Sequence, residues 1–312
     1  MTPPDPVGAL VDAVLDDVVL APVDLARLAT AGEVTRAVVL AEARPPGEAA
    51  AALAAVAESV GRAGDAGRAH ELVGLALSAT PDRCQSTELL VSCAEAEALA
   101  GDTATARELI VEAHARCRPW EVHRGRAVEV ASRHALVLHE VGAAAEAREA
   151  AADAEDRARA VPSRGWRDDA LGRAAAVWAA LGASGRSSAL ADELADPWSR
   201  VEVLVAIARA PSTPQGVASN ALRRAGEEAA RIDYAAWRAE AMGAVAVARD
   251  LRGEAAGAEA LTATLSDPVW AAETWLALAA NAVTRGDADG AARRVGRGRD
   301  AARRCDYGWW HR

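Results

Sequence analysis

The chain has 312 residues, of which 51% are hydrophobic and 26% are charged, and its formal net charge is −10 at pH 7. This composition is typical of a folded protein and excludes an intrinsically disordered one. The net negative charge excludes nucleic acid as the main partner, because phosphate contacts need clustered positive charge. Alanine dominates the hydrophobic residues, phenylalanine is absent and only two tyrosines occur, so the sequence predicts an all-α protein.

The N-terminal segment, residues 1–22, is expected to contain a capping helix. Its first six residues have neither the basic nor the apolar region of a signal peptide, and no apolar run in the chain approaches the ~20 residues that span a bilayer. The four cysteines show no close pairing, which is typical of a reducing compartment: Cys84, Cys93, Cys117 and Cys305. We therefore expect a cytoplasmic protein that does not bind membranes.

Single glycines interrupt the alanine-rich stretches at regular intervals over residues 23–306. They are Gly32, Gly64, Gly101, Gly142, Gly182, Gly253 and Gly286. The intervals are 32, 37, 41, 40, 71 and 33 residues, and the interval of 71 fits two units. The missing break falls at residues 211–214, where Pro211 and Pro214 end a helix. The pattern predicts about eight consecutive helix–turn–helix units, each with a first helix A and a second helix B.

Small residues recur at fixed distances from these turns. Seven residues before the turn position stand Ala57, Ala94, Ala135, Ala175, Ala208, Ala246 and Ala279. Five residues after it stand Ala37, Ala69, Ala106, Ala147, Ala258 and Ala291, with Ser187 departing from the pattern. Small residues at matched places let two consecutive helices approach closely. A helix pair cannot bury its apolar stripe alone, so the pairs are expected to stack into an α-solenoid.

Three of the turns are Gly–Asp pairs, beginning at Gly64, Gly101 and Gly286. Around the first of them, residues 57–81 also have a small residue on helix A, alanines on helix B and a closing Pro81. In these features the sequence resembles the tetratricopeptide-repeat (TPR) family over about residues 23–306, although the aromatic positions of that family are mostly Ala or Val here. The resemblance implies a right-handed α-solenoid whose concave groove binds peptides or protein surfaces.

A carboxylate recurs 13 residues before the turn position in six consecutive units: Glu88, Glu129, Asp169, Glu202, Glu240 and Glu273. We expect these residues in the first turn of each helix A, where a negative charge stabilises the helix N-terminus by roughly 0.3–1 kcal/mol. In a TPR-like superhelix the same position faces the concave groove. The resemblance therefore also implies an acidic stripe that recognises a basic or N-terminal segment of a partner, and both interpretations stay open.

Tryptophans recur near the junctions of units: Trp166, Trp198, Trp237 and Trp270. Two of them follow Asp–Pro pairs that begin at Asp196 and Asp267, a strong helix start with aspartate as N-cap and proline as first helical residue. The tryptophans either wedge neighbouring units together or form an aromatic ladder that grips a ligand in the groove.

The C-terminal tail, residues 307–312, contains two adjacent tryptophans, Trp309 and Trp310. Because each can bury roughly 150–250 Å², we expect one to pack on the last helix pair as a cap and the other to dock a partner or a second copy of the chain. A homo-oligomer is therefore open. The arginines before the tail are expected on the solvated face of the last helix: Arg293, Arg294, Arg297, Arg299, Arg303 and Arg304.

The sequence assembles no recognised catalytic or metal-binding motif. Candidate metal ligands are not at zinc-like intervals, and we expect no metal site from them: His114, Cys117 and His123, with Cys84 or Cys93. The acid pairs at Asp16 and Asp168 face different sides of a helix and lack a second metal-binding motif, which excludes terpene-cyclase chemistry. No phosphate-binding glycine loop or nucleophile elbow occurs.

We therefore expect a non-catalytic scaffold or adaptor, without a cofactor, that binds a partner polypeptide in its groove. The alternative is a ligand-responsive sensor that closes around a small peptide or metabolite, which would need a closed pocket with convergent polar groups. An enzyme of unrecognised type is the third possibility.

Overall fold

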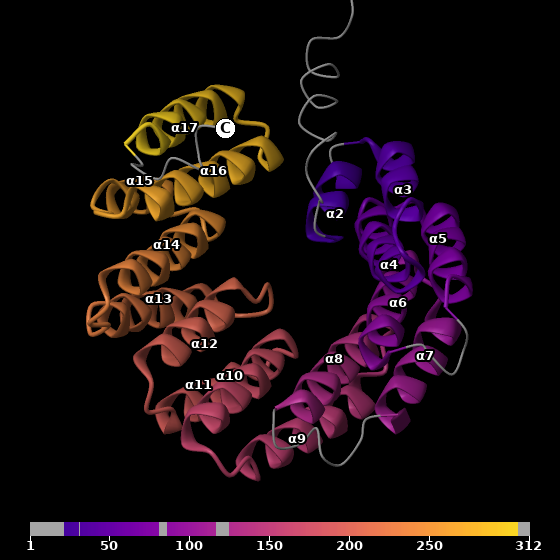
Figure 1. Cartoon of the computed structure of the whole chain (residues 1–312). Coiled ribbons are helices and arrows are strands. Elements are labelled where there is room, and N and C mark those ends of the chain that lie inside the picture. Colours follow the sequence, from indigo (N-terminus) through magenta and orange to yellow (C-terminus); the bar gives the residue numbers. More distant parts are fainter. Residues whose placement is uncertain (1–21, 31, 81–85, 117–124, 305–312) are drawn as a thin grey trace, which may run out of the picture. The chain divides into compact units, whose positions relative to one another are not determined.

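The computed structural model describes residues 22–30, 32–80, 86–116 and 125–304. The predicted N-terminal capping helix and the predicted roles of Trp309 and Trp310 lie outside these residues. Within them the secondary structure is helical throughout, with no strand, and sixteen helices follow one another in eight antiparallel A/B pairs (Figure 1). The prediction of an all-α chain of about eight helix–turn–helix repeats is confirmed.

The A helices are α2 (Pro22–Thr30), α4 (Pro46–Arg62), α6 (Thr87–Ala100), α8 (Arg126–Glu140), α10 (Arg164–Ala180), α12 (Pro197–Arg209), α14 (Ala235–Leu251) and α16 (Pro268–Thr284). The B helices are α3 (Val34–Glu42), α5 (Ala66–Ser78), α7 (Thr103–Arg116), α9 (Ala144–Arg159), α11 (Ser184–Glu193), α13 (Gln215–Ala229), α15 (Ala255–Ala263) and α17 (Ala288–Ala302).

The turns between A and B helices lie where the glycines predict. All seven glycines have a φ between 75° and 96°, a left-handed conformation in which any side chain would be strained. The sixth pair, α12 and α13, turns without glycine, at residues 211–214, and Pro214 is the N-cap of α13. The two Asp–Pro starts are also confirmed, because Asp196 and Asp267 accept backbone hydrogen bonds at the beginnings of α12 and α16.

The two series of small residues lie in the interior of the helix pairs. Every alanine of both series is buried. Ser187, the one departure, is also fully buried, and its hydroxyl donates a 2.7 Å hydrogen bond to the carbonyl of Ala175 on the facing helix. Ser187 is therefore small enough for the buried position, and its hydroxyl is not left without a hydrogen-bond partner.

Within each compact unit, neighbouring pairs stack through their A helices. In unit 1, α2 packs on α4 and α4 on α6, and in unit 2, α10 packs on α12, α12 on α14 and α14 on α16. Glycines mark two of these contacts. A Cβ on Gly61 would stand 3.1 Å from the carbonyl oxygen of Ala96, and one on Gly243 would stand 2.5 Å from Oγ1 of Thr274. The backbones are therefore as close as a missing side chain allows.

Arginine side chains seal three of the junctions, a feature that the sequence analysis did not identify. Arg167, Arg200 and Arg238 are each the fourth residue of an A helix. Their guanidinium groups reach back to backbone carbonyls before the helix, at Val161 (2.8 Å), Leu194 (2.7 Å) and Ile232 (2.8 Å). Each bond satisfies a carbonyl that the preceding chain leaves without a helical partner.

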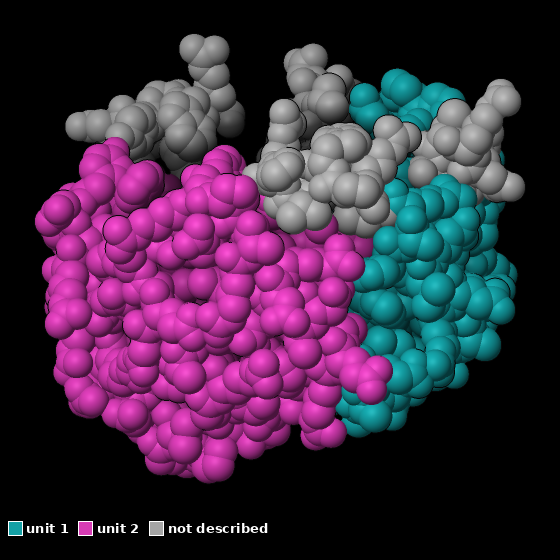
Figure 2. Space-filling view, turned by 90° about the horizontal axis from the view of Figure 1, so that it is seen from below, with its two compact units in different colours: residues 1–119, 133–147 teal, residues 120–132, 148–312 magenta. Residues whose placement is uncertain are grey.

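The contacts divide the chain into two compact units, drawn in different colours in Figure 2. Unit 1 comprises residues 1–119 and 133–147, and unit 2 comprises residues 120–132 and 148–312. The division passes through the fourth pair, α8 and α9. The bounds of the predicted array, residues 23–306, stay a prediction. No described helix has the length and apolarity that crossing a bilayer requires.

A buried charge network joins the last two helix pairs. Asp250 on α14 is fully buried, and Arg294 on α17 is only 3% exposed. Arg294 donates to Asp250, to Glu259 and to the carbonyl of Leu278, while Arg285 also pairs with Asp250. The solvated-face prediction is thus wrong for Arg294, because a buried carboxylate on the neighbouring pair requires a counter-charge.

The small positions generate a stability prediction. Ala246→Leu should lower the free energy of unfolding by roughly 1–3 kcal/mol, because the larger side chain overpacks the contact between α14 and its neighbours. Urea denaturation followed by circular dichroism measures the change. Ala280→Leu, at an exposed position of α16, is the matched control and should be near wild type. Equal stabilities of the two variants would contradict the packing described here.

The buried charge network around Asp250 generates a second stability prediction. Asp250→Asn removes the charge that faces Arg294 and should lower the free energy of unfolding by about 3 kcal/mol, the low end for a broken buried pair because Glu259 still contacts Arg294. Asp300→Asn breaks the exposed Asp300–Arg303 pair and should cost less than about 1 kcal/mol. Similar losses in both variants would show that burial does not set the strength of the Asp250 network.

Candidate functional site on the A helices of unit 2

Four of the six carboxylates predicted as a stripe lie on consecutive A helices of unit 2. They are Asp169 on α10, Glu202 on α12, Glu240 on α14 and Glu273 on α16, and together we call them the acidic row. Each is the sixth residue of its helix and therefore lies in the second turn. The prediction that they lie in the first turn is wrong for these four. The helix dipole acts mainly within the first turn, so it does not account for these four carboxylates.

The other two members of the predicted stripe differ from the row. Glu88 and Glu129 do lie in the first turns of α6 and α8, where a carboxylate stabilises the helix N-terminus. Both are half-buried. Glu88 belongs to unit 1. For these two residues the helix-dipole interpretation suffices.

Neighbouring carboxylates of the row repel one another. Partial burial, followed by the charge of Asp169, raises the pKa of Glu202, and a hydrogen bond from Trp198 offsets part of this effect. Partial burial, followed by the charges of Glu273 and Glu202, raises the pKa of Glu240. Asp169 also pairs with Arg173 one turn along α10, at 3.2 Å. The row therefore concentrates negative charge at a cost to stability.

Tryptophans lie beside the row. The rings of Trp198 on α12 and Trp237 on α14 are 6.5 Å apart between centroids, and Tyr234 meets Trp237 edge-on at 5.3 Å. Trp237 and Trp166 are each 58% exposed, so neither is buried between helix pairs, as the wedge interpretation requires. Trp198 and Trp270 are half-buried. The structure thus brings two of the predicted tryptophans together on the surface, with Tyr234 as a third ring.

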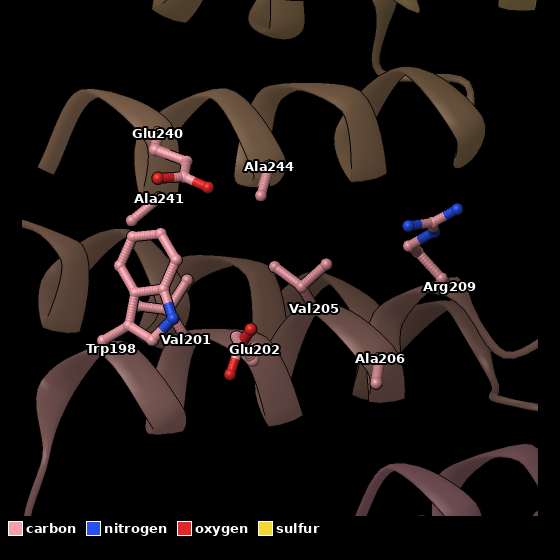
Figure 3. Close-up of a pocket in the computed structure, with 9 residues that line it drawn as sticks. All are labelled: Trp198, Val201, Glu202, Val205, Ala206, Arg209, Glu240, Ala241 and Ala244. Atoms are coloured by element: carbon pink, nitrogen blue, oxygen red, sulfur yellow. The ribbon is translucent and has the colours of Figure 1, made fainter. Parts of the chain in front are cut away.

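A pocket of ≈ 300 Å³ opens between α12 and α14. Figure 3 shows Trp198, Glu202 and Glu240 gathered at one end of it and Arg209 at the other. The wall between them is apolar, with Val201, Val205, Ala206, Ala241 and Ala244. The pocket therefore combines an aromatic face, two carboxylates from adjacent helices and an aliphatic wall.

A buried tryptophan that the sequence analysis did not identify, Trp178, also lies beside a carboxylate, and there an arginine joins them. The indole N–H of Trp178 donates a 2.8 Å hydrogen bond to Glu155, and the guanidinium of Arg186 lies 4.4 Å from the centroid of the Trp178 ring. Arg186 also donates to Glu155 at 2.8 Å. Burial alone would raise the pKa of Glu155, but hydrogen bonds from Arg186, Arg159 and Trp178 outweigh it and lower that pKa.

The candidate metal ligands from which the sequence predicts no site are only partly within the described residues. Cys84, Cys117 and His123 lie outside them, His114 stacks on His134 at 5.1 Å, and Cys93 is buried. Burial, with a contribution from the charge of Glu97, raises the pKa of Cys93 to about 12. The Cys93 thiol is therefore protonated and poorly suited to bind a metal ion.

A different group of three potential ligands lies in unit 1, where atoms of His70, Glu97 and Asp102 are within 4.8 Å of one another. The hydrogen bond with Glu97, 2.9 Å from Nδ1, raises the pKa of His70. Asp102 accepts from the backbone N–H of Thr105 at the start of α7. Internal contacts account for all three, because His70 bonds to the fully buried Glu97 and Asp102 accepts from Thr105.

The second of the adjacent acid pairs has separate structural roles. Asp168 is buried and accepts hydrogen bonds from the backbone N–H groups of Ala195 and Asp196, at 3.0 and 3.2 Å, just before α12. Asp169 belongs to the acidic row. The two carboxylates therefore face different neighbours, as the sequence analysis expects, while Asp16 and Asp17 lie outside the described residues.

No protein-family model and no curated protein sequence matches the chain. Among solved structures it is similar to one described as "Crystal Structure of Rap Protein Complexed with Competence and Sporulation Factor". The two chains are 16% identical with a TM-score of 0.37, and the match covers 85% of this chain and 79% of the other. At this TM-score the fold assignment rests on the helix pairs described above and not on the likeness.

The raised pKa values of the row predict a pH dependence of stability. Because the folded state holds the proton of Glu240 more readily than the unfolded state, the charged carboxylate destabilises the fold at pH values above its raised pKa. Glu240→Gln should therefore raise the melting temperature at pH 7. This advantage should disappear below the ordinary pKa of 4.5, where both states are protonated.

Thermal unfolding of both proteins between pH 3 and 8 measures this difference. Glu149→Gln is the control, since Glu149 is exposed on α9. A Glu240→Gln variant that is no more stable than wild type at neutral pH would contradict the repulsion within the row.

Proposed function

We propose that the chain is a non-catalytic interaction module of the TPR type, a cytoplasmic scaffold or adaptor that binds a basic segment of a partner polypeptide along the acidic row. The observation that carries this proposal is the row itself, with carboxylates on four consecutive A helices. Partial burial and the charges of neighbouring row members raise the pKa of Glu202 and of Glu240. Charge that destabilises the folded chain, kept on one surface, favours a role in binding.

The pairing of other acids in unit 2 supports this interpretation. Glu155, Glu228 and Asp250 each contact arginine side chains. Within the described part of the chain, Glu202, Glu240 and Glu273 form no ion pair, although arginine is abundant. A partner that carries Lys or Arg would supply the missing counter-charge and would be steered to this surface by it.

The surface chemistry also agrees with binding an extended chain. The row advances by one carboxylate per helix pair. Packed helices are about 8–10 Å apart and an extended peptide advances about 3.3–3.6 Å per residue, so roughly every third residue of a peptide can meet a successive A helix. The exposed rings of Trp237 and Tyr234 offer contact area beside it. The pocket between α12 and α14 supports the second candidate, a sensor of a small peptide or metabolite, because it offers convergent polar groups in an apolar wall.

A peptide selection tests the proposal. Phage that display a random peptide library are selected on the immobilised full chain, and the bound peptides are sequenced. We expect enrichment of Arg and Lys, and loss of that enrichment in a row variant with Asp169→Asn, Glu202→Gln, Glu240→Gln and Glu273→Gln. The affinity of selected peptides should also fall as salt rises, since exposed charges act over a Debye length of ~8 Å at physiological ionic strength.

The matched control carries the same change of net charge on the B helices, at Glu149, Glu227, Asp289 and Asp300, which are all exposed. It should keep the enrichment. Loss of basic peptides in both variants would mean that net charge alone attracts them, and no enrichment on the wild-type chain would rule out the proposed function.

A further inference from the structure

The pocket between α12 and α14 has the groups that hold an arginine side chain elsewhere in this chain. At the buried site, Trp178 and Glu155 are joined by an indole hydrogen bond, and Arg186 completes the arrangement by lying over the ring and donating to the same carboxylate. In the pocket, Trp198 and Glu202 are likewise neighbours, one turn apart on α12, and both line the cavity. The two sites share a tryptophan beside a carboxylate.

We propose that this pocket binds the side chain of one arginine of a peptide partner, with the guanidinium against Trp198 and its N–H groups donating to Glu202 and Glu240. The inference rests on the proposed function and specifies the residue type that the row selects at this point. Arginine enters from the partner as an amino acid within a chain, so the peptide backbone crosses the A helices along the acidic row and only the arginine side chain is enclosed.

Each part of the pocket matches one part of that side chain. The apolar wall of Val201, Val205 and Ala244 fits the methylene stem. A planar guanidinium stacks on an indole face and presents a fork of donors, so it can bond two carboxylates that come from adjacent helices (Figure 3). Lysine has a single compact charge with no plane to stack, and it fits such a site less well.

The surrounding charges restrict the occupant to one cation. Arg209 lies at the opposite end of the pocket and repels a second basic side chain there. On the other side, Arg173 contributes a positive charge near Glu202, but it is paired with Asp169 at 3.2 Å. Glu202 and Glu240 are therefore the carboxylates that face an incoming guanidinium.

The exposed rings next to the pocket suit the residues that flank the arginine. Trp237 lies 6.5 Å from Trp198 between ring centroids, and Tyr234 extends the aromatic surface beyond it. Flexible, flat or aliphatic residues of the peptide can pack against these rings, which adds contact area without adding charge. The expected recognition sequence is thus an arginine followed or preceded by an apolar residue.

Small peptides test the inference on the full chain labelled with nitrogen-15. The probes are three capped tripeptides, acetyl-glycyl-arginyl-glycine amide and its lysine and citrulline counterparts. Binding is followed by the indole N–H resonances of the nine tryptophans, with Trp198 assigned from the resonance that is lost in Trp198→Phe. We expect the arginine peptide to shift the Trp198 resonance saturably, with a Kd at least about tenfold lower than that of either analogue.

Protein variants provide the second part of the test. Glu202→Gln and Glu240→Gln should each raise the Kd of the arginine peptide several-fold, whereas Glu149→Gln and Glu227→Gln should not. Since citrulline has nearly the shape of arginine without the charge, the peptide series keeps the test decisive even if a variant folds poorly. Equal binding of the three tripeptides would overturn the inference, as would unchanged binding in both pocket variants.

Three further outcomes separate this inference from a metabolite site and from the proposed function. Free L-arginine that binds more tightly than the capped tripeptide would make the pocket a metabolite site and overturn the peptide form. Basic peptides that are selected by the wild-type chain and lost in the row variant, with no preference between arginine and lysine, would keep the proposed function and overturn only the pocket. Arginine selectivity of the tripeptides without any enrichment of basic peptides would overturn only the proposed function.

Discussion

The close approach of helices A and B at their small residues is the contact on which the other features of the structure depend. At each such contact an alanine of one helix meets its partner helix with no side-chain volume to spare, and Ser187 keeps the distance by bonding to the carbonyl of Ala175. The contact fixes the rotation of each A helix. Each residue of the acidic row lies six positions before the buried alanine of its A helix, which is about 240° around the helix. The row therefore lies on a different face of the A helix from the buried alanine.

Charge is distributed in two ways on this scaffold. In the interior, carboxylates such as Glu155 and Asp250 are surrounded by arginine side chains, which balances the cost of removing them from water. Along the A helices of unit 2, carboxylates instead face one another, and the pKa values of Glu202 and Glu240 rise. The first arrangement locks helix pairs together, while the second stores repulsion that a cation from outside can relieve. This contrast links the stability of the array to its proposed role in binding.

The tryptophans divide in the same manner. Trp178 and Trp275 are buried, and arginines cover their rings at 4.4 and 4.8 Å from the centroids. Trp198 and Trp237 stand at the surface and face each other across adjacent A helices. A tryptophan pairs well with arginine in both settings, because its large negative face attracts a weakly hydrated cation. In the interior the chain provides that cation itself, and at the pocket we infer that a partner provides it.

The sequence by itself determined the helical class, the number of helix pairs, the glycine turns and the buried alanine positions, because these follow from local propensity and from a spacing that repeats along the chain. It also located the carboxylates of the row. Only the tertiary structure decided that these lie in the second turn of their helices, that Arg294 is buried, and that Trp198, Glu202 and Glu240 share one pocket. Such facts depend on which side chains from separate helices meet. The repeat fixes the spacing of residues within each helix pair. The contacts between helix pairs depend instead on the individual side chains that depart from the repeat.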